Sequence, residues 1–267
     1  MHRAFSSHKR LPQLRMIEST ISYGLPSINR FVPVHTRTEL IKKLVSSGIS
    51  NVYAGNLNCN GSLFGTRDLL LDTKDIGYGE RTLSTSALTP TMIRSFMSSG
   101  ADELVIPVNL RIPFYLETSL LFKDEIFLAR SNGHNVRLQI DGICESNEED
   151  CRRLIEHFVL SGITRVTLLV GERICTPSFI SLLLRWMKDL VPKECIALGF
   201  QHKSLSNVYI GIEEGIETYH TSLGGLGNYT NTLCLAEFAR EQKIEIPNLD
   251  LFRLRETDRW WKLVVSS

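Results

Sequence analysis

The chain has 267 residues, which is enough for one large domain with a sizeable core. Its content of 43% hydrophobic and 22% charged residues is typical of a soluble globular protein. A formal net charge of +1 gives no electrostatic case for binding nucleic acid or an anionic membrane. The longest apolar runs, such as Ile180–Leu184, are far shorter than the roughly 20 residues that span a bilayer. We therefore expect neither nucleic-acid binding nor membrane insertion.

Six cysteines are scattered along the chain without any CxxC pair, at Cys59, Cys144, Cys151, Cys175, Cys195 and Cys234. This pattern argues against a zinc site and a disulfide framework, and it favours an intracellular, reducing compartment. Residues 1–13 are basic, and no acidic residue precedes Glu18. The segment is compatible with a mitochondrial presequence or with a disordered basic tail, so mitochondrial and cytoplasmic locations both stay open.

A short apolar run followed by a longer amphipathic run recurs about eight times, which is typical of alternating strands and helices. The predicted strands are Leu14–Ile21, Asn51–Gly55, Thr82–Ser86, Glu103–Pro107, Val136–Asp141, Arg165–Val170, Cys195–Phe200 and Thr218–Ser222. Helices are predicted over Thr36–Ser47, with Thr36 as a capping residue, and over Asn147–Ser161.

Eight such units without an obvious linker predict an α/β fold, a single (β/α)₈ TIM barrel with a parallel sheet over residues 14–247. The first predicted strand is not followed by GxGxxG, which a dinucleotide-binding sheet would carry there. Residues 248–267 lie outside the repeats and are expected to form a C-terminal extension that packs on the barrel. Trp260 and Trp261 in this extension are interpreted as packing residues, with an apolar partner-binding patch as the alternative.

Catalytic groups of such barrels follow the C-terminal ends of the strands. Several segments at these ends, and one that leads into the fourth strand, occur in the order of one known family. These segments are ISYGLP (Ile21–Pro26), ALTP (Ala87–Pro90), SSGADELVI (Ser98–Ile106), CTP (Cys175–Pro177), ALGFQH (Ala197–His202) and SLGGLGN (Ser222–Asn228). The first stands in the place of GPRDGLQ, and the last is similar to the AGLGG segment, of 3-hydroxy-3-methylglutaryl-CoA (HMG-CoA) lyase. The chain thus resembles a divergent HMG-CoA lyase of the DRE-TIM metallolyase superfamily.

The resemblance implies a site for a divalent cation, Mg²⁺ or Mn²⁺, that polarises the substrate oxygens. In the family this ion is held by an Asp after strand one, two His after strand seven and an Asn after strand eight, while an Arg and a Cys assist the chemistry. Most of these positions carry other residues here: Tyr23 for the Asp, Ser22 for the Arg, Tyr53 for a Glu after strand two, Val170 and Gly171 for an Asp-Thr pair, and Phe200 for the first His. The loop with the catalytic Cys is missing. His202 and Asn228 remain as candidate metal ligands, and Glu18 on the first strand is retained.

Two other groups of residues are candidates for function. Glu18 and His220 are candidate catalytic residues, and a rewired site would combine them with His202, Gln201 and Asp141. A histidine held by hydrogen bonds at the barrel mouth is the structural alternative for His202. The glycines Gly224, Gly225 and Gly227 are candidates for binding the phosphates of a cofactor such as CoA, or they serve a tight turn with positive φ.

Two functions follow as alternatives. In the first, the chain has lost most metal and catalytic residues, is inactive in the family reaction, and acts by binding or scaffolding. Its partners would be an acyl-CoA-type small molecule, a second copy of itself in a homo-oligomer, or an active relative in a hetero-oligomer. In the second, it is an active carbon–carbon lyase of acyl-CoA or 2-oxoacid metabolism with a rewired site. A mouth filled by Tyr23, Tyr53 and Phe200 would favour the first, and a cavity lined by His202, His220 and Glu18 the second.

Overall fold

Eight parallel strands close into a barrel in which each strand pairs with its neighbours in the sequence and β1 pairs with β8. The computed structural model describes residues 13–28, 31–57, 66–76, 81–111, 122–171, 176–201 and 205–266. The strands are β1 (Arg15–Glu18), β2 (Asn51–Asn56), β3 (Thr82–Ser86), β4 (Glu103–Asn109), β5 (Asn135–Asp141), β6 (Arg165–Val170), β7 (Ile196–Phe200) and β8 (Thr218–Thr221). The predicted TIM barrel is therefore confirmed.

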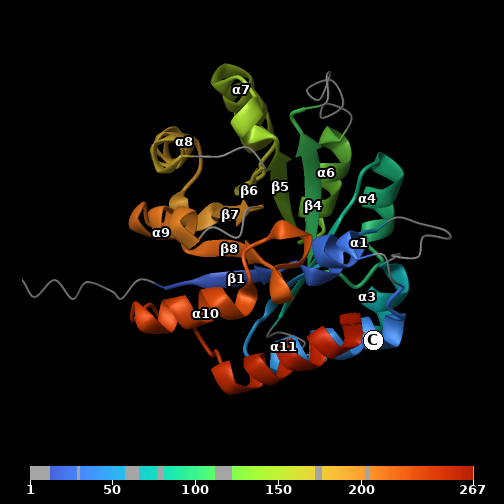
Figure 1. Cartoon of the computed structure of the whole chain (residues 1–267). Helices are drawn as coiled ribbons and strands as arrows, with labels where there is room; N and C mark the ends of the chain where they lie inside the picture. The colour runs from blue at the N-terminus through green and yellow to red at the C-terminus, as the bar shows by residue number, and fades with distance from the viewer. Residues whose placement is uncertain are drawn as a thin grey trace, which may run out of the picture.

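Helices lie outside the barrel and alternate with the strands (Figure 1). They are α1 (Leu25–Ser27), α2 (Val34–Ser46), α3 (Arg67–Thr73), α4 (Pro90–Phe96), α6 (Lys123–Ser131), α7 (Glu148–Leu160), α8 (Pro177–Leu190), α9 (Leu205–Glu213), α10 (Thr232–Glu241) and α11 (Leu251–Ser266). Four short turns of helix accompany them: η1 (Thr20–Gly24), η2 (Ile143–Glu145), η3 (Lys193–Cys195) and η4 (Leu223–Asn228).

Local signals explain where individual helices start and stop. Helix α7 begins after Asn147, whose side chain accepts a hydrogen bond from the Glu149 backbone, and it runs into Gly162 with φ of +88°. Helix α2 begins earlier than predicted, at Val34, because Pro33 precedes the first turn with a fixed φ of −58°. The prediction that Thr36 caps this helix is wrong, since Thr36 lies within the first turn.

The core has two parts, which lie on opposite faces of the sheet. Alternate strand residues point outward into a large apolar layer beneath the helices, and the others point into the barrel. Ile17, Tyr53, Val105 and Ala197 form a separate apolar cluster within the barrel. The side chains of the sheet therefore divide into those that hold the helices and those that fill or line the barrel.

A polar network occupies the barrel interior beside this cluster. Glu103 on β4 binds Arg137 on β5, and Arg137 Nη1 donates to Thr167 Oγ1 at 3.3 Å. The same threonine hydroxyl lies 3.3 Å from His220 Nε2, and Ser19 Oγ lies 2.9 Å from His220 Nδ1. This network links β4, β5, β6 and β8, and the residue that follows β1, through side chains alone.

The C-terminal helix α11 lies against α2 and α10 on the outside of the barrel (Figure 1). Its buried residues are Leu254, Thr257, Asp258 and Trp261, which recur every three or four positions and so share one face. Within the described residues, no helix is both long enough and apolar enough to cross a membrane.

One cysteine departs from the expectation that the chain carries no disulfide framework. Cys144 is disulfide-bonded. Cys151, Cys195 and Cys234 are free thiols. The basic segment of residues 1–12 also lies outside the described residues.

Candidate functional site

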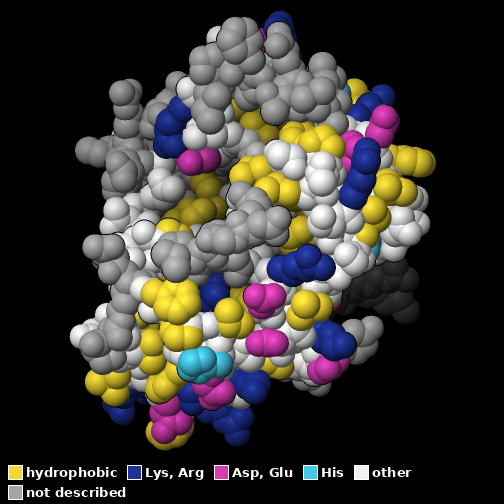
Figure 2. Space-filling view, turned by 90° about the vertical axis from the view of Figure 1, so that its right-hand side faces the viewer, with side chains coloured by type: hydrophobic (Ala, Val, Ile, Leu, Met, Phe, Trp, Pro, Cys, Tyr) yellow, Lys and Arg dark blue, Asp and Glu magenta, His cyan; other side chains and the backbone are white. Residues whose placement is uncertain are grey.

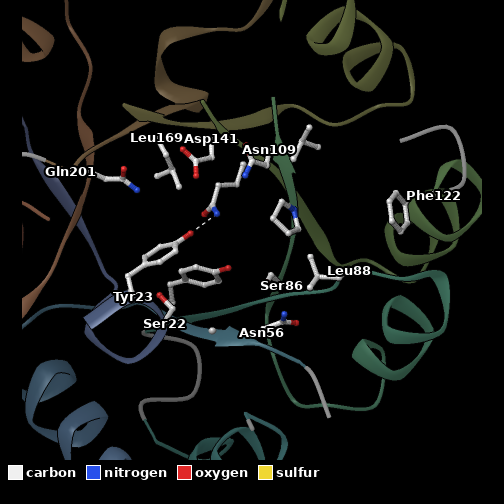
Figure 3. Close-up of a pocket in the computed structure, with 15 residues that line it drawn as sticks. Ser22, Tyr23, Asn56, Ser86, Leu88, Asn109, Phe122, Asp141, Leu169 and Gln201 are labelled. Atoms are coloured by element: carbon white, nitrogen blue, oxygen red, sulfur yellow. Dashed lines mark hydrogen bonds between the residues drawn. The ribbon is translucent and has the colours of Figure 1, made fainter. Parts of the chain in front are cut away.

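A cavity of about 470 Å³ opens at the C-terminal ends of the strands. Its described lining residues are Ser22, Tyr23, Tyr53, Gly55, Asn56, Ser86, Leu88, Pro107, Val108, Asn109, Phe122, Gln139, Asp141, Leu169 and Gln201. Hydrophobic side chains are visible in the hollow of the face drawn in Figure 2. Figure 3 shows Tyr23, Ser86, Asp141 and Gln201 reaching toward this space from different elements. The cavity lies where barrels of this kind hold their ligands.

Two tyrosines, Tyr23 and Tyr53, line the cavity, and a third, Tyr229, packs against Tyr23. Tyr23, from η1, stacks on Tyr229 with ring centroids 4.8 Å apart and leans on Tyr53 at 5.4 Å. Gln139 on β5 donates a hydrogen bond from its side-chain amide to the Tyr23 hydroxyl, drawn as a dashed line in Figure 3. Burial raises the pKa of the Tyr23 phenol well above its ordinary value and also raises that of Tyr53. Both phenols are therefore neutral near pH 7.

An ion pair stands at the rim of the cavity. Arg111, just after β4, binds Asp141 at the end of β5, with Nη1 and Oδ2 3.1 Å apart. Asp141 also accepts a hydrogen bond from the Gly142 backbone at 2.7 Å. A Cβ on Gly171 would lie 2.5 Å from Arg111 Nη2, so a glycine there leaves room for the guanidinium. The two charges compensate one another at the mouth.

The residues at the family's metal positions do not fit a hard divalent cation. Tyr23, in the place of the anionic Asp, is a neutral phenol already engaged with Gln139 and the neighbouring rings. Asn228 is exposed and adopts φ of +63°. Among the described residues, no three side chains of His, Cys, Asp or Glu converge as metal ligands would. A cation that prefers several oxygen ligands with negative charge finds no such set there.

The alternation of side chains along β7 decides which of its residues face the cavity. Phe200 is buried in the outer apolar layer, whereas Gly199 approaches His220 inside the barrel and Gln201 lines the cavity. Gly199 and Gln201 therefore share the inner face of β7, which is the face that two ligands of an ion inside the barrel would need. The expectation that Phe200 helps fill the mouth is therefore wrong, because its ring packs in the outer apolar layer. His202 lies outside the described residues.

The two candidate catalytic residues lie away from the cavity. Glu18 points outward from β1 and accepts hydrogen bonds from the Thr20 backbone at 2.8 Å and from the Thr20 and Thr232 hydroxyls. Burial raises its pKa to about 6, against the opposing effect of these hydrogen bonds. His220 is buried inside the barrel, where both ring nitrogens have hydroxyl neighbours. Burial first, and Arg137 second, lower the pKa of His220 to about 3.

The three glycines after β8 all adopt left-handed conformations with φ of +65°. Gly227 also approaches the Tyr23 backbone so closely that a Cβ would lie 2.6 Å from its carbonyl oxygen. Gly224 has open space around it. The turn therefore requires glycines for its own geometry and supports the segment that carries Tyr23. Phosphate binding by this turn stays a prediction.

Of the proposed rewired set, the structure brings Gln201 and Asp141 into the cavity and leaves Glu18 and His220 outside it. Sequence reasoning missed Gln139, Asn56, Asn109 and Arg111. The signal for Gln139 was present, because strand alternation puts residue 139 on the same face of β5 as Asp141.

Comparisons with known proteins agree with the resemblance seen in the motifs. No family model matches the chain. A curated relative, the mitochondrial hydroxymethylglutaryl-CoA lyase of Arabidopsis thaliana, is 24% identical over 242 residues, which cover 82% of this chain and 51% of that protein. The chain thus spans about half the length of the curated relative that it matches.

Solved structures of HMG-CoA lyases superpose on the barrel. The Bacillus subtilis enzyme has a TM-score of 0.86 at 17% identity, covering 96% of this chain and 95% of its own. The Acinetobacter baumannii enzyme, solved with coenzyme A and 3-methylmalate, also reaches 0.86, at 19% identity, covering 96% and 92%. Fold and sequence together place this chain beside the HMG-CoA lyases, as a barrel of their type that is similar to them at low identity.

Proposed function

We propose that this barrel binds a small molecule at its mouth and does not perform the metal-dependent carbon–carbon cleavage of the HMG-CoA lyases. The observation that carries the proposal is Tyr23, which stands at the position of the family's anionic metal ligand. Its phenol is neutral, stacks on Tyr229 and accepts a hydrogen bond from Gln139. A side chain held in this way supplies neither the charge nor the free oxygen that a divalent cation needs.

Carbon–carbon cleavage of the HMG-CoA lyase type depends on more than one of the missing groups. A bound cation would polarise the substrate oxygens, and an arginine beside it would stabilise the developing enolate. Ser22 stands in the place of that arginine and lines the cavity with a small neutral hydroxyl. Each missing charge typically costs orders of magnitude in rate. The cavity itself is retained, and it offers the space in which a small molecule would bind.

An active lyase with a rewired site is the second candidate, and the open cavity favours it. The two tyrosines narrow the mouth without closing it, and Asp141, Arg111 and Gln201 gather at its rim. Such an enzyme would cleave an acyl-CoA or 2-oxoacid substrate through these residues. A scaffolding role in a homo-oligomer, or in a hetero-oligomer with an active relative, stays a prediction.

Calorimetry with Mg²⁺ and Mn²⁺, together with an assay of HMG-CoA cleavage, tests the proposal on the purified chain. We expect no binding at millimolar ion and no cleavage. Micromolar binding accompanied by cleavage would overturn the proposal in favour of the second candidate.

Tyr23→Asp adds a test of the residue that carries the proposal. Restoring the carboxylate should raise cation affinity, whereas Tyr209→Asp, which changes an exposed tyrosine on α9, should not. Equal responses of the two variants would show that the identity of residue 23 does not govern cation binding.

A further inference from the structure

A chain of side-chain hydrogen bonds crosses the barrel interior and passes through His220. Arg137 Nη1 donates to Thr167 Oγ1 at 3.3 Å, and this oxygen lies 3.3 Å from His220 Nε2. On the other side of the ring, Nδ1 lies 2.9 Å from Ser19 Oγ, which is within 3.3 Å of the Ile17 carbonyl oxygen. Thr167 and Ser19 are fully buried and His220 is 2% exposed, so bulk solvent does not compete for these groups.

The two ends of this chain fix the direction in which its protons point. A guanidinium can only donate, so the Thr167 oxygen accepts from Arg137. The proton of the Thr167 hydroxyl then has one acceptor among the described residues, His220 Nε2. At the other end the Ile17 carbonyl can only accept, so it takes the proton of Ser19 and leaves the Ser19 oxygen to accept from His220 Nδ1.

Of the two neutral tautomers of His220, one places every proton of the chain. With the proton on Nδ1, the ring donates to Ser19 and accepts from Thr167. With the proton on Nε2, the Thr167 oxygen would receive two donors, and its own proton would have no acceptor within the described part of the barrel. Stranding a buried donor costs its desolvation, which corresponds to a preference of about fivefold or more for the Nδ1–H tautomer.

The doubly protonated ring does not fit this environment either. It would strand the same Thr167 proton, and it would bring a second positive charge close to Arg137. Glu103 is bound by two hydrogen bonds from Arg137 and makes none with the ring. Tyr53 meets the His220 ring edge-on, with centroids 6.3 Å apart, and burial raises the pKa of its phenol, so it supplies no negative charge. Burial and, second, Arg137 accordingly lower the pKa of His220 to about 3.

We propose that Arg137 acts through the Thr167 hydroxyl to hold His220 as the neutral Nδ1–H tautomer, which makes the ring a structural bridge and not an acid–base group. Arg137 and Thr167 are positioning residues in this arrangement, because they select the nitrogen that carries the proton. The bridge joins Ser19, which follows β1, to β5 and β6, directly behind the cavity residue Tyr53. A rewired lyase would have to draw its proton-transfer groups from residues other than His220.

Nitrogen-15 NMR of the imidazole rings reads the tautomer directly, because protonated and unprotonated ring nitrogens have well-separated shifts. The full chain is labelled at its seven histidines, and the signals of His220 are those that disappear in His220→Gln. At pH 7 we expect a protonated Nδ1 and an unprotonated Nε2, with this tautomer favoured by about five to one or more. The same pattern should persist at pH 5, where a histidine with an ordinary pKa of about 6.5 is mostly charged.

Variants of the chain test the route by which the tautomer is selected. Thr167→Val removes the hydroxyl that donates to Nε2 and keeps the shape of the side chain, so the ratio of tautomers should fall toward one. Arg137→Met should also lower the ratio, because Thr167 is then free to accept from Nε2 without stranding its own proton. Thr85→Val is the matched control: Thr85 is equally buried on β3 but donates to the Gly55 carbonyl, so the ratio should not change.

A proton on Nε2, a charged ring at pH 5, or a ratio that Thr167→Val leaves unchanged would each overturn the inference. Thermal unfolding shows whether each variant is folded, and the wild-type spectrum tests the tautomer and the charge even where Arg137→Met does not fold. These outcomes are independent of cation affinity and of HMG-CoA cleavage. The proposed function and the tautomer of His220 can therefore fail separately.

Discussion

Glu103 is the most deeply buried acid inside the barrel, and its charge is held by two arginines of different exposure. Arg137 binds it through two hydrogen bonds, at 3.0 and 3.1 Å, and Arg165 through one, at 3.1 Å. The Arg137 side chain is 12% exposed, whereas that of Arg165 is 42% exposed. The two arginines therefore offer a matched comparison of a buried and a half-exposed partner for the same carboxylate.

We predict that Arg137→Met lowers the free energy of unfolding by about 3–5 kcal/mol, because it leaves a buried carboxylate with an incomplete partner. Arg165→Met should cost about 1 kcal/mol or less, since solvent screens that pair. Urea unfolding measures both values. The double variant Arg137→Met with Glu103→Gln should recover part of the loss, and equal costs for the two arginines would contradict the assignment of burial as the cause.

Single residues of the site were partly predictable from the sequence. Tyr23 and Tyr53 were assigned to the old metal cavity by their places in the motifs, and both line it. The prediction that Phe200 fills the mouth was wrong because it ignored the alternation of side chains along the strand. That alternation turns the Phe200 ring outward. The burial of His220 depends on the register in which β8 pairs with β1 and β7. Tertiary pairing sets this register, and local sequence patterns do not encode it.

At the scale of elements, the glycine turn η4 supports the π-helical segment η1. Both Gly224 and Gly227 adopt φ of +65°, but only Gly227 would place a Cβ against the Tyr23 carbonyl, 2.6 Å away. We predict that Gly224→Ala costs about 1 kcal/mol from backbone strain alone, and that Gly227→Ala costs more because the turn must also move away from η1. Chemical unfolding of the two variants gives the difference directly.

Helix α11 carries a second matched pair of side chains. Trp261 is fully buried between α11 and the elements beneath it, whereas Trp260 is only partly buried and lies under Lys43 of α2, with Nζ 5.2 Å from its ring centroid. Trp261→Ala should destabilise the chain by about 3–5 kcal/mol through the cavity that it leaves. Trp260→Ala should cost much less, since its ring is only partly buried and a cation over such a ring contributes about 0.5–1 kcal/mol. Similar losses in thermal unfolding would mean that α11 docks through both rings.

For the whole molecule, the barrel was the most predictable feature because its signal repeats. The strands Thr82–Ser86 and Arg165–Val170 match the prediction residue for residue, since each is a short run between two amphipathic segments of the repeating pattern. The first strand was predicted as Leu14–Ile21 but ends at Glu18, where the chain turns into η1. Ile21 continues the apolar pattern of the strand in the sequence, but in the structure it lies in η1 and is buried there. The periodicity of the sequence alone therefore could not mark where β1 ends.

The stability of the whole barrel should depend on pH through two buried groups that act in opposite directions. The pKa of His220 falls from 6.5 to about 3 on folding, so the unfolded chain binds the extra proton between these values. This contribution is complete above pH 6.5 and is lost as the pH falls toward 3, by about 1.4 kcal/mol per unit. The pKa of Glu18 rises from 4.5 to about 6, so its contribution is complete below pH 4.5 and is lost as the pH rises through 6.

Between pH 4.5 and 6 the two contributions therefore offset one another, and below 4.5 the loss from His220 stands alone. Urea unfolding across this range, with Glu18→Gln and His220→Gln beside the wild type, separates them. Relative to the wild type, Glu18→Gln should lose stability as the pH falls from 6 to 4.5, because the compensating proton uptake of the folded state is gone. His220→Gln should gain stability relative to the wild type from pH 6.5 downward. A His220→Gln difference curve that is flat over this range would show that His220 titrates alike in the folded and unfolded chains, and that burial and Arg137 do not lower its pKa.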